Sequence, residues 1–426
     1  MRSLYWKKGR LREHQNIELR KIINNAYFNV PFYNKLFKKR DLKPGDIKTV
    51  DDLYKIPVIR KNELREKIDE TVSVRFNRGA LIPHHTSGST GEPFTVLFSQ
   101  KEDDFRKAKH LRDNIACGLR PRDRWVTLTS PSHSTQVSEF HRLLNLYAPI
   151  YLSVFDSEDY KIDFLKRVKP DVLDSYQSSL LILANELEKR EEKEIKPRFI
   201  LSGAELLDEF SRGVIERALD TPIYDTYATI EVERIAWQCP EKNEYHMDTD
   251  AIVVQFVDEN GEEVSEGERG EIICTSLFSY SMPFIRYSQG DIGIPSANIC
   301  TCGITLPLMK IIEGRTDQVL PLPNGSYFSP RHFCLTMNSF ELINYFDQFR
   351  VIQKKIDSFE FLIKMKNNQI EEKKMKERLA DHIRKMLNLE DYNMTFEINF
   401  VNEIPLEKTG KLRAVVSELN TPRAPL

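Results

Sequence analysis

The chain has few cysteines and no excess of charge of either sign, and both shortages restrict the kind of protein it can be. Six cysteines in 426 residues are too few for the disulfide framework of a small secreted domain. The 62 lysines and arginines nearly balance the 64 aspartates and glutamates, which leaves a formal net charge of −2. This balance disfavours nucleic acid and anionic membrane surfaces as the main partners.

Long apolar runs are missing as well. No stretch approaches the roughly 20 apolar residues that a membrane-spanning helix needs. The basic segment 1–12 lacks the apolar stretch of a secretory signal. We therefore expect a cytoplasmic protein, in a compartment that supplies ATP. With 40% hydrophobic and 30% charged residues, the composition is typical of a globular protein.

Short apolar segments alternate with amphipathic segments from Leu81 onward. The pattern predicts strands at 125–129, 172–175, 199–202 and 271–275, and helices at 105–116, 180–193 and 208–219. Such an alternation predicts an α/β core with largely parallel strands. The residues before this region have the apolar spacing of helices, which Pro31 is expected to interrupt.

The composition changes near Gly314. Beyond it we predict strand structure at 349–365, a charged helix at 371–387 and a strand at 394–401. The Lys- and Glu-rich run 371–374 is interpreted as the solvated face of that helix. The predicted fold class is therefore α/β, with a large multi-sheet N-terminal domain at 1–316 and a small α+β C-terminal domain at 317–426.

A loop rich in glycine and hydroxyl side chains gives the sharpest local signal. It has the sequence TSGSTGEP at 86–93 and follows the apolar residues Leu81 and Ile82. Its backbone N–H groups can approach anionic oxygens closely, and its hydroxyl groups add donors. It is not a Walker A loop, because no Gly-Lys-Ser/Thr follows. Taken alone, such a cluster is more often a flexible turn, so its interpretation depends on what accompanies it.

Four further motifs follow this loop in order. They are DTYATIE at 225–231, RYSQGD at 286–291, GRTD at 314–317 and PLEKTGKLR at 405–413. The series resembles the adenylate-forming superfamily of acyl- and aryl-coenzyme A ligases, luciferases and nonribosomal adenylation domains. It is most similar to the phenylacetate–coenzyme A ligase group, including its capsule-biosynthesis branch. The resemblance extends over essentially the whole chain, from VPFY at 30–33 to Lys411.

The resemblance implies a site for ATP and Mg²⁺. The β- and γ-phosphates would be held by Thr86, Ser87, Gly88, Ser89, Thr90 and Gly91. The remainder of the nucleotide would be bound by Gly203, Ala204, Glu205, Tyr227, Asp291 and Arg315. Within that set Tyr227 would stack near the adenine, and Asp291 would accept hydrogen bonds from the ribose hydroxyls. The catalytic residues would be Lys411, Glu231 and Thr229. Glu231 would help to hold Mg²⁺ and Thr229 would contact the α-phosphate.

These residue types suit the chemistry that the resemblance implies. A carboxylate that attacks the α-phosphate of ATP must overcome repulsion between anions, and the leaving pyrophosphate needs its charge neutralised. Mg²⁺ on Glu231 and the ammonium group of Lys411 would supply that positive charge. The resemblance also implies that the small domain is mobile and turns at Asp317 between two reaction steps. The alternative is that Glu231 is a surface carboxylate and Lys411 belongs to an exposed turn.

Two departures from the family's pattern need weighing. Ala228 replaces a usual glycine, although Thr229 and Glu231 remain. The segment LPLPNG at 320–325 stands where coenzyme A-dependent members usually carry a glycine-containing apolar stretch that helps to admit the thiol. The acceptor therefore stays open between coenzyme A, a carrier-protein thiol and an amine.

The identity of the acid is not readable from the residues, and an aromatic acid is favoured by the resemblance alone. The residues expected to select it lie within 125–177 and 202–228. His133 is a candidate contact in the first of these stretches, and its alternative is an ordinary loop histidine.

Three cysteines and one histidine form a second candidate site. The set Cys239, His246, Cys300 and Cys302 offers a complete tetrahedral coordination sphere for zinc. Members of the phenylacetate-ligase group show a similar cysteine pattern here, although the Cys-x-Cys spacing is tighter than usual. The alternative is reduced cysteines in or near the core, which we expect for Cys117, Cys274 and Cys334. Four protein ligands leave no open position, so a zinc ion here would be structural.

The sequence therefore predicts an AMP-forming acid–thiol or acid–amine ligase. Its reaction would convert a carboxylic acid and ATP to an acyl-adenylate and pyrophosphate, followed by transfer of the acyl group to an acceptor. The alternative is a non-catalytic nucleotide-binding or assembly protein that retains the fold. The presence of both Lys411 and Glu231 disfavours that alternative.

Overall fold

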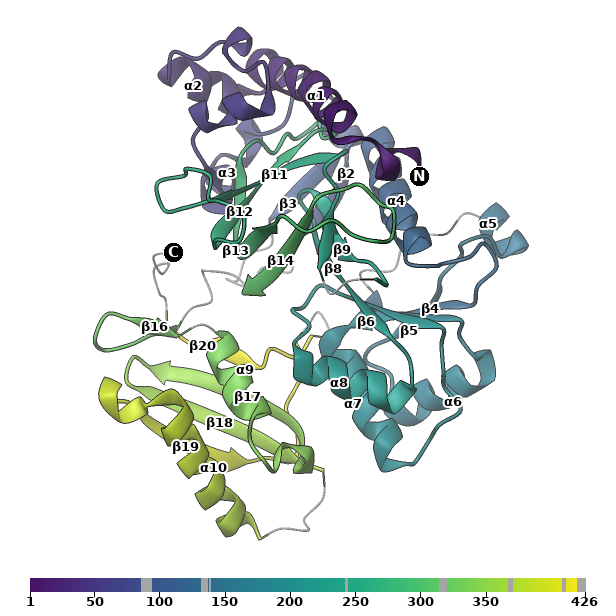
Figure 1. Ribbon diagram of the computed structural model, residues 1–426, viewed down its shortest axis with the longest axis vertical. Helices are drawn as coiled ribbons and strands as arrows, with labels where there is room; N and C mark the ends of the chain where they lie inside the picture. Colours follow the sequence, from purple (N-terminus) through teal and green to yellow (C-terminus); the bar gives the residue numbers. More distant parts are fainter. Residues whose placement is uncertain are drawn as a thin grey trace. The chain divides into compact units, whose positions relative to one another are not determined.

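The computed structural model describes residues 1–85, 94–131, 137, 139–241, 244–313, 320–328, 330–366, 371–407 and 411–419. The chain divides into two compact units, each built from two stretches that are distant in sequence. The first unit comprises 1–120 and 224–312, and the second comprises 121–223 and 313–425 (Figure 1). Within the described ranges, no helix is both long and apolar enough to cross a membrane.

Helices begin the first unit. They are α1 (Lys8–Asn29), α2 (Pro31–Lys39), α3 (Lys61–Glu66) and α4 (Gln100–Ala116). The predicted interruption at Pro31 is confirmed, because this proline is the first residue of α2, a position that needs no backbone N–H. Helix α4 begins with a capping box, in which the Ser99 side chain accepts from the Glu102 N–H and the Glu102 carboxylate accepts from the Ser99 N–H.

The strands of the first unit form a mainly antiparallel sheet. They are β1 (Ile59–Arg60), β8 (Ile223–Thr229), β9 (Glu233–Gln238), β10 (Tyr245–Met247), β11 (Ile252–Val257), β12 (Gly270–Ser276), β13 (Tyr287–Ser296) and β14 (Leu308–Glu313). Their order is β11-β12-β13-β14-β10-β9-β8, with β1 parallel to β13. The expectation of largely parallel strands is wrong for this unit. The described residues between β8 and β13 contain no crossover helix, which parallel neighbours require.

A two-stranded sheet also belongs to the first unit. Strand β2 (Ile82–His85) pairs antiparallel with β3 (Thr95–Phe98). The two strands flank the glycine- and hydroxyl-rich loop in the sequence. Ile82 pairs with Phe98 and His85 with Thr95, so the described residues on either side of that loop lie next to each other.

The N-terminal part of the second unit is the parallel α/β structure that the sequence predicted. Its strands are β4 (Trp125–Thr129), β5 (Ile150–Ser153), β6 (Val172–Tyr176) and β7 (Phe199–Gly203). Their order is β7-β6-β4-β5 and every pairing is parallel. The accompanying helices are α5 (Glu139–Leu144), α6 (Glu158–Val168), α7 (Gln177–Lys189) and α8 (Glu209–Leu219). Apolar residues of both kinds of element share one core, for example Val126, Leu173, Leu180 and Ile215.

The C-terminal part of the second unit is a small sheet with two helices packed on it (Figure 1). Its elements are β15 (Leu320–Pro321), β16 (Tyr327–Phe328), α9 (Pro330–Asn338), β17 (Phe346–Lys355), β18 (Ser358–Met365), α10 (Glu372–Leu387), β19 (Thr395–Phe400) and β20 (Val415–Ser417). The main strands have the order β19-β18-β17-β20. The segment predicted as strand structure at 349–365 is a hairpin of two antiparallel strands, β17 and β18.

Helix α10 separates apolar from charged residues. Met375, Leu379, Ile383 and Leu387 recur every four residues and are buried in the core of the small sheet. The run 371–374 is exposed, which confirms its interpretation as a solvated helix face.

Candidate active site

Part of the predicted nucleotide site lies outside the described residues. This applies to Thr86, Ser87, Gly88, Ser89, Thr90 and Gly91, to Arg315 and Asp317, and to the candidate acid contact His133. The remaining predicted residues form two groups, one in each unit.

In the first unit, three side-chain hydrogen bonds join the end of β8 to one face of β13. They involve Tyr227, Thr229 and Glu231, which alternate along the chain. Their partners are, in the same order, Asp291 Oδ2 at 2.6 Å, Gln289 Nε2 at 2.9 Å and the Tyr287 hydroxyl at 2.9 Å. The partners also alternate, so their side chains share one face of β13. The structure thus brings four predicted residues together in matching register, and we call them and their partners the β8–β13 set.

The carboxylate of Glu231 has a second charged neighbour. The side chain of Glu231 is 3% exposed, and the ammonium group of Lys61 lies 3.3 Å from its Oε1 atom. The same ammonium group lies 5.6 Å from the ring centroid of Phe94, the residue directly after the glycine- and hydroxyl-rich loop. Lys61 therefore places a mostly buried positive charge between that loop's exit and the predicted magnesium ligand.

Sequence reasoning missed three members of this site. Tyr287 and Gln289 belong to the RYSQGD motif, and strand periodicity would have placed them on the same face as Asp291. Lys61 stands in a charged helical segment, and no local pattern distinguishes it from its neighbours.

In the second unit, Lys411 lies against the residues that follow β7. Its ammonium group donates to the carbonyl oxygen of Ala204 over 3.0 Å and lies 5.4 Å from the centroid of the Tyr176 ring. Ala204 has a φ of 64°, a backbone conformation that residues with a Cβ rarely adopt. The predicted residues 203–205 and Lys411 are therefore neighbours.

Some effects raise the pKa of Glu205 and others lower it. Burial raises the pKa of its carboxyl group, while hydrogen bonds from Ser178 and the positive charge of Lys411 act in the opposite direction. Ser178 donates its backbone N–H to Glu205 Oε2 over 2.7 Å and its hydroxyl to Oε1 over 3.0 Å.

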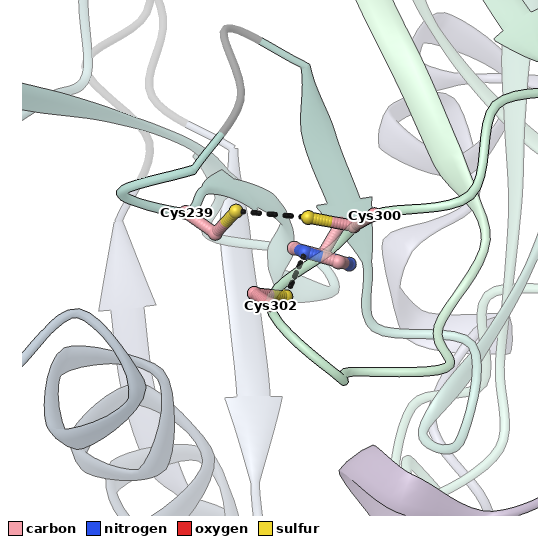
Figure 2. A group of neighbouring side chains, drawn as sticks. Cys239, Cys300 and Cys302 are labelled. Carbon is pink, nitrogen blue, oxygen red and sulfur yellow. Dashed lines mark hydrogen bonds between the residues drawn. The ribbon is translucent and has the colours of Figure 1, made fainter.

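The three cysteines and the histidine converge in the first unit. One potential ligand atom from each of Cys239, His246, Cys300 and Cys302 lies within 4.8 Å of all the others. Cys239 Sγ and Cys300 Sγ are 3.3 Å apart (Figure 2), and Cys302 Sγ lies 3.3 Å from His246 Nε2. Cys239 follows β9, His246 is in β10, and Cys300 and Cys302 lie between β13 and β14.

The histidine of this cluster is already oriented. Its Nδ1 atom lies 3.4 Å from the carbonyl oxygen of Leu306, a contact that leaves Nε2 directed at the thiols. A carbonyl partner on the second ring nitrogen is the usual support for a zinc-bound histidine. The donor set and its convergence fit a tetrahedral zinc ion.

The other cysteines are free thiols. Cys117 and Cys274 are buried and Cys334 is half-buried, which agrees with the prediction of reduced cysteines in or near the core. Burial raises the pKa of Cys274 to about 12, so this thiol stays protonated near neutral pH.

The comparisons with known proteins agree with the motif series. Residues 330–418 match the model of the CapK C-terminal domain. The chain is 25% identical to a phenylacetate–coenzyme A ligase of Thermus thermophilus, over 74% of this chain and 72% of that protein. It is 24% identical to protein CapK of Staphylococcus aureus, over 96% of this chain and 89% of that protein. The predicted resemblance to the phenylacetate–coenzyme A ligase group and its capsule-biosynthesis branch is therefore confirmed.

The fold has a counterpart among solved structures. A 2-hydroxyisobutyryl-coenzyme A ligase, crystallised in the postadenylation state with 2-HIB-AMP, aligns with a TM-score of 0.81. The alignment covers 97% of this chain and 91% of that chain at 18% identity. At this identity the likeness concerns the fold, and it confirms the predicted α/β class with a C-terminal domain.

Proposed function

We propose that the chain is an AMP-forming ligase that activates a carboxylic acid with ATP in the cytoplasm. A carboxylate oxygen attacks the α-phosphorus, the bond from that phosphorus to the bridging oxygen of the β-phosphate breaks, and pyrophosphate leaves with the electron pair. The acyl group then passes to a nucleophile, and AMP leaves. The β8–β13 set carries this proposal, because it aligns a carboxylate for ribose, a hydroxyl for phosphate and a buried carboxylate for a cation.

Hydrogen bonds orient the Thr229 hydroxyl and the Asp291 carboxylate of the β8–β13 set. The hydroxyl oxygen of Thr229 accepts from Gln289 Nε2 and from the Val232 N–H, which leaves its own hydrogen to donate to the α-phosphate. The Tyr227 hydroxyl fixes one oxygen of Asp291, and the carboxylate can accept from the ribose hydroxyls. The loop 86–91 and Arg315 complete the nucleotide site in this proposal.

Glu231 suits Mg²⁺, which proteins commonly bind through one or two carboxylates together with substrate phosphates. Bound there, Mg²⁺ would neutralise the charge of the departing pyrophosphate. The Lys61 ammonium group lies 3.3 Å from the same carboxylate and offsets its negative charge. If Glu231 held Mg²⁺, Lys61 would be able to contact the phosphates, because its side chain is a flexible stem with a terminal charge.

The two reaction steps would use different arrangements of the chain. We propose a large domain at 1–316 and a small mobile domain at 317–426, with Asp317 at the hinge. Lys411 would act only in adenylation, where negative charge builds up on the α-phosphate and the pyrophosphate. The acyl transfer that follows creates no such charge, so it does not need this lysine.

An exchange assay tests the proposed activity. Radioactive pyrophosphate should enter ATP only when the correct acid is present, because exchange requires reversible formation of the acyl-adenylate. The screen should include phenylacetate, 2-hydroxyisobutyrate, other aromatic and aliphatic acids, and amino acids. Acid-dependent exchange supports the ligase. Nucleotide binding without exchange for any acid supports the alternative, a non-catalytic nucleotide-binding or assembly protein.

Glu231→Gln should impair adenylation and raise the Mg²⁺ concentration needed for half-maximal rate. We expect the magnesium requirement to rise by on the order of 10- to 100-fold, because a neutral amide is a weaker ligand for a hard cation. The measurement is the initial rate of exchange as a function of Mg²⁺ concentration. Glu262→Gln, which changes an exposed carboxylate of the same unit, is the matched control. An unchanged magnesium dependence in Glu231→Gln would remove Glu231 from the metal site.

Coenzyme A is expected to be a poor acceptor. Residues 320–328 form a short hairpin, in which Leu320 pairs with Phe328 and Gly325 adopts a φ of 84°. A proline-containing hairpin here replaces the stretch that helps to admit the thiol in coenzyme A-dependent relatives. Once the acid is known, acyl-coenzyme A formation should require coenzyme A well above micromolar concentrations. Efficient formation at micromolar coenzyme A would show that this hairpin does not restrict the thiol.

The four-residue cluster of cysteines and histidine would hold a structural zinc ion. The proposal is supported by the convergence of four ligand atoms and by the carbonyl contact of His246. Zinc would join the residue after β9, a residue of β10 and the segment before β14. It would have no part in the reaction, because four protein ligands complete its coordination.

A further inference from the structure

Ser178, the second residue of α7, takes part in hydrogen bonds both as a donor and as an acceptor. Both its backbone N–H and its hydroxyl donate to the carboxylate of Glu205. The first N–H groups of a helix have no partner within the helix, and a carboxylate is a favourable acceptor at that end. A hydroxyl has one hydrogen, and in Ser178 it is directed at Glu205. The oxygen of Ser178 is therefore an acceptor toward any other group.

That acceptor is used by the segment that carries Lys411. The backbone N–H of Leu412 donates to the Ser178 hydroxyl oxygen over 3.2 Å. The ammonium group of Lys411, the residue before Leu412, donates to the carbonyl oxygen of Ala204, the residue before Glu205. The carboxylate of Glu205 therefore orients the Ser178 hydroxyl, whose oxygen accepts from the Leu412 N–H. Glu205 also directly follows the residue whose carbonyl oxygen accepts from Lys411.

The same segment is held from the small sheet. Arg350 of β17 donates from Nε to the carbonyl oxygen of Arg413 over 3.0 Å, and from its terminal nitrogen to that of Pro405 over 2.8 Å. The Glu407 N–H donates to the carbonyl oxygen of Lys411 over 2.8 Å. The backbone at 411–413 is thus fixed on one side by β17 and on the other by Ser178.

We propose that Ser178 and Glu205 are positioning residues for Lys411, and that they hold its backbone in place for adenylation. This inference rests on the adenylating role of Lys411 proposed above. A lysine ammonium group stands at the end of a four-carbon stem, so its position is defined only if the backbone that carries it is fixed. With Leu412 bonded to Ser178, the backbone next to Lys411 is fixed, and rotation about side-chain bonds is the motion left to the ammonium group.

Hydrogen exchange of the Leu412 amide tests the contact without any nucleotide or acid. In the protein alone, Ser178→Ala removes the acceptor, and Glu205→Gln removes the charge that orients it. Each should speed exchange in the peptide that contains Leu412 by about fivefold or more, as expected for loss of one hydrogen bond. Ser179→Ala is the matched control, because Ser179 is the next residue on the same helix and is also buried. Unchanged exchange in Ser178→Ala and Glu205→Gln would overturn the proposal.

Half-reaction kinetics test the positioning role, with the acid that gives the fastest pyrophosphate exchange. Ser178→Ala should slow adenylation about five- to tenfold and leave transfer from supplied acyl-adenylate unchanged. Ser178→Thr, which keeps the hydroxyl, should restore adenylation. In a Lys411→Ala background, Ser178→Ala should have no further effect on adenylation, because a positioning residue acts through the group that it positions.

The outcomes separate this proposal from the proposed function. Faster exchange at Leu412 together with wild-type adenylation in Ser178→Ala would overturn the positioning role. An equal slowing by Ser178→Ala with and without Lys411 would also overturn it, because the serine would then act independently of the lysine. A wild-type adenylation rate in Lys411→Ala would instead reject the role proposed for the lysine itself.

Discussion

Lys411→Ala should slow adenylate formation by on the order of 10²-fold or more, which corresponds to about 3 kcal/mol of transition-state stabilisation. The lysine is a compact positive charge, and the attack of one anion on another creates negative charge on the α-phosphate and on pyrophosphate. Alanine removes that charge without a substitute. Transfer of the acyl group from supplied acyl-adenylate should stay nearly as fast as in the wild type, because that step no longer builds charge on a departing pyrophosphate.

Single-turnover kinetics of each half-reaction separate these two effects. Lys354→Ala is a suitable control, because it removes another lysine of the C-terminal part. Lys354 is on β17 and forms an ion pair with Glu360 of β18. This control should leave both half-reactions unchanged. An equal loss of rate in both half-reactions of Lys411→Ala would point to damaged folding of the C-terminal segment instead of lost charge.

Removal of zinc should destabilise the first unit. We expect about one zinc ion per chain by elemental analysis of the purified protein. Cys300→Ser should lower the zinc content and the stability by about 3 kcal/mol, or roughly 6–12 °C in melting temperature. The physical reason is that the ion would link β9, β10 and the segment before β14 through four ligands from two distant stretches of the sequence.

Cys117→Ser provides the control for zinc content. Cys117 is a buried thiol whose Sγ lies 3.5 Å from the carbonyl oxygen of Gln238, the residue before Cys239. This variant should keep its zinc even if its stability changes, because Cys117 is not one of the four converging ligands. Wild-type protein that contains no metal, or a Cys300→Ser variant of unchanged melting temperature, would contradict the zinc proposal.

The motif series named residues that the structure brings together, but it did not predict the contacts between them. The motifs named Asp291 of β13 and the alternating residues Tyr227, Thr229 and Glu231. Strand periodicity explains why those three contact alternate residues of β13. Lys61 could not be predicted. It approaches Glu231 through the parallel pairing of β1 with β13, a long-range contact that leaves no local trace in the chain.

The direction of strands was the weakest part of the fold prediction. Apolar runs identified β4, β6 and β7 and also β12, but an apolar run reads the same in parallel and antiparallel sheets. The hairpin of β17 and β18 was missed for a related reason. Its turn at Ile356 and Asp357 contains no glycine, so the usual signal of a hairpin is absent from the sequence. The cysteine cluster was predictable as a set of ligands, but its convergence depended on how β10 and β14 pair.

Isotope transfer from the acid tests the central claim most directly. With both carboxylate oxygens labelled as ¹⁸O, attack on the α-phosphorus places one labelled oxygen in the acyl-adenylate bridge. Cleavage at the acyl carbon during transfer then leaves that oxygen in AMP. We predict that mass spectrometry will find one ¹⁸O atom in each AMP formed, with pyrophosphate as the other product of ATP. Unlabelled AMP, or ADP and phosphate in place of AMP and pyrophosphate, would contradict activation of the acid as its adenylate.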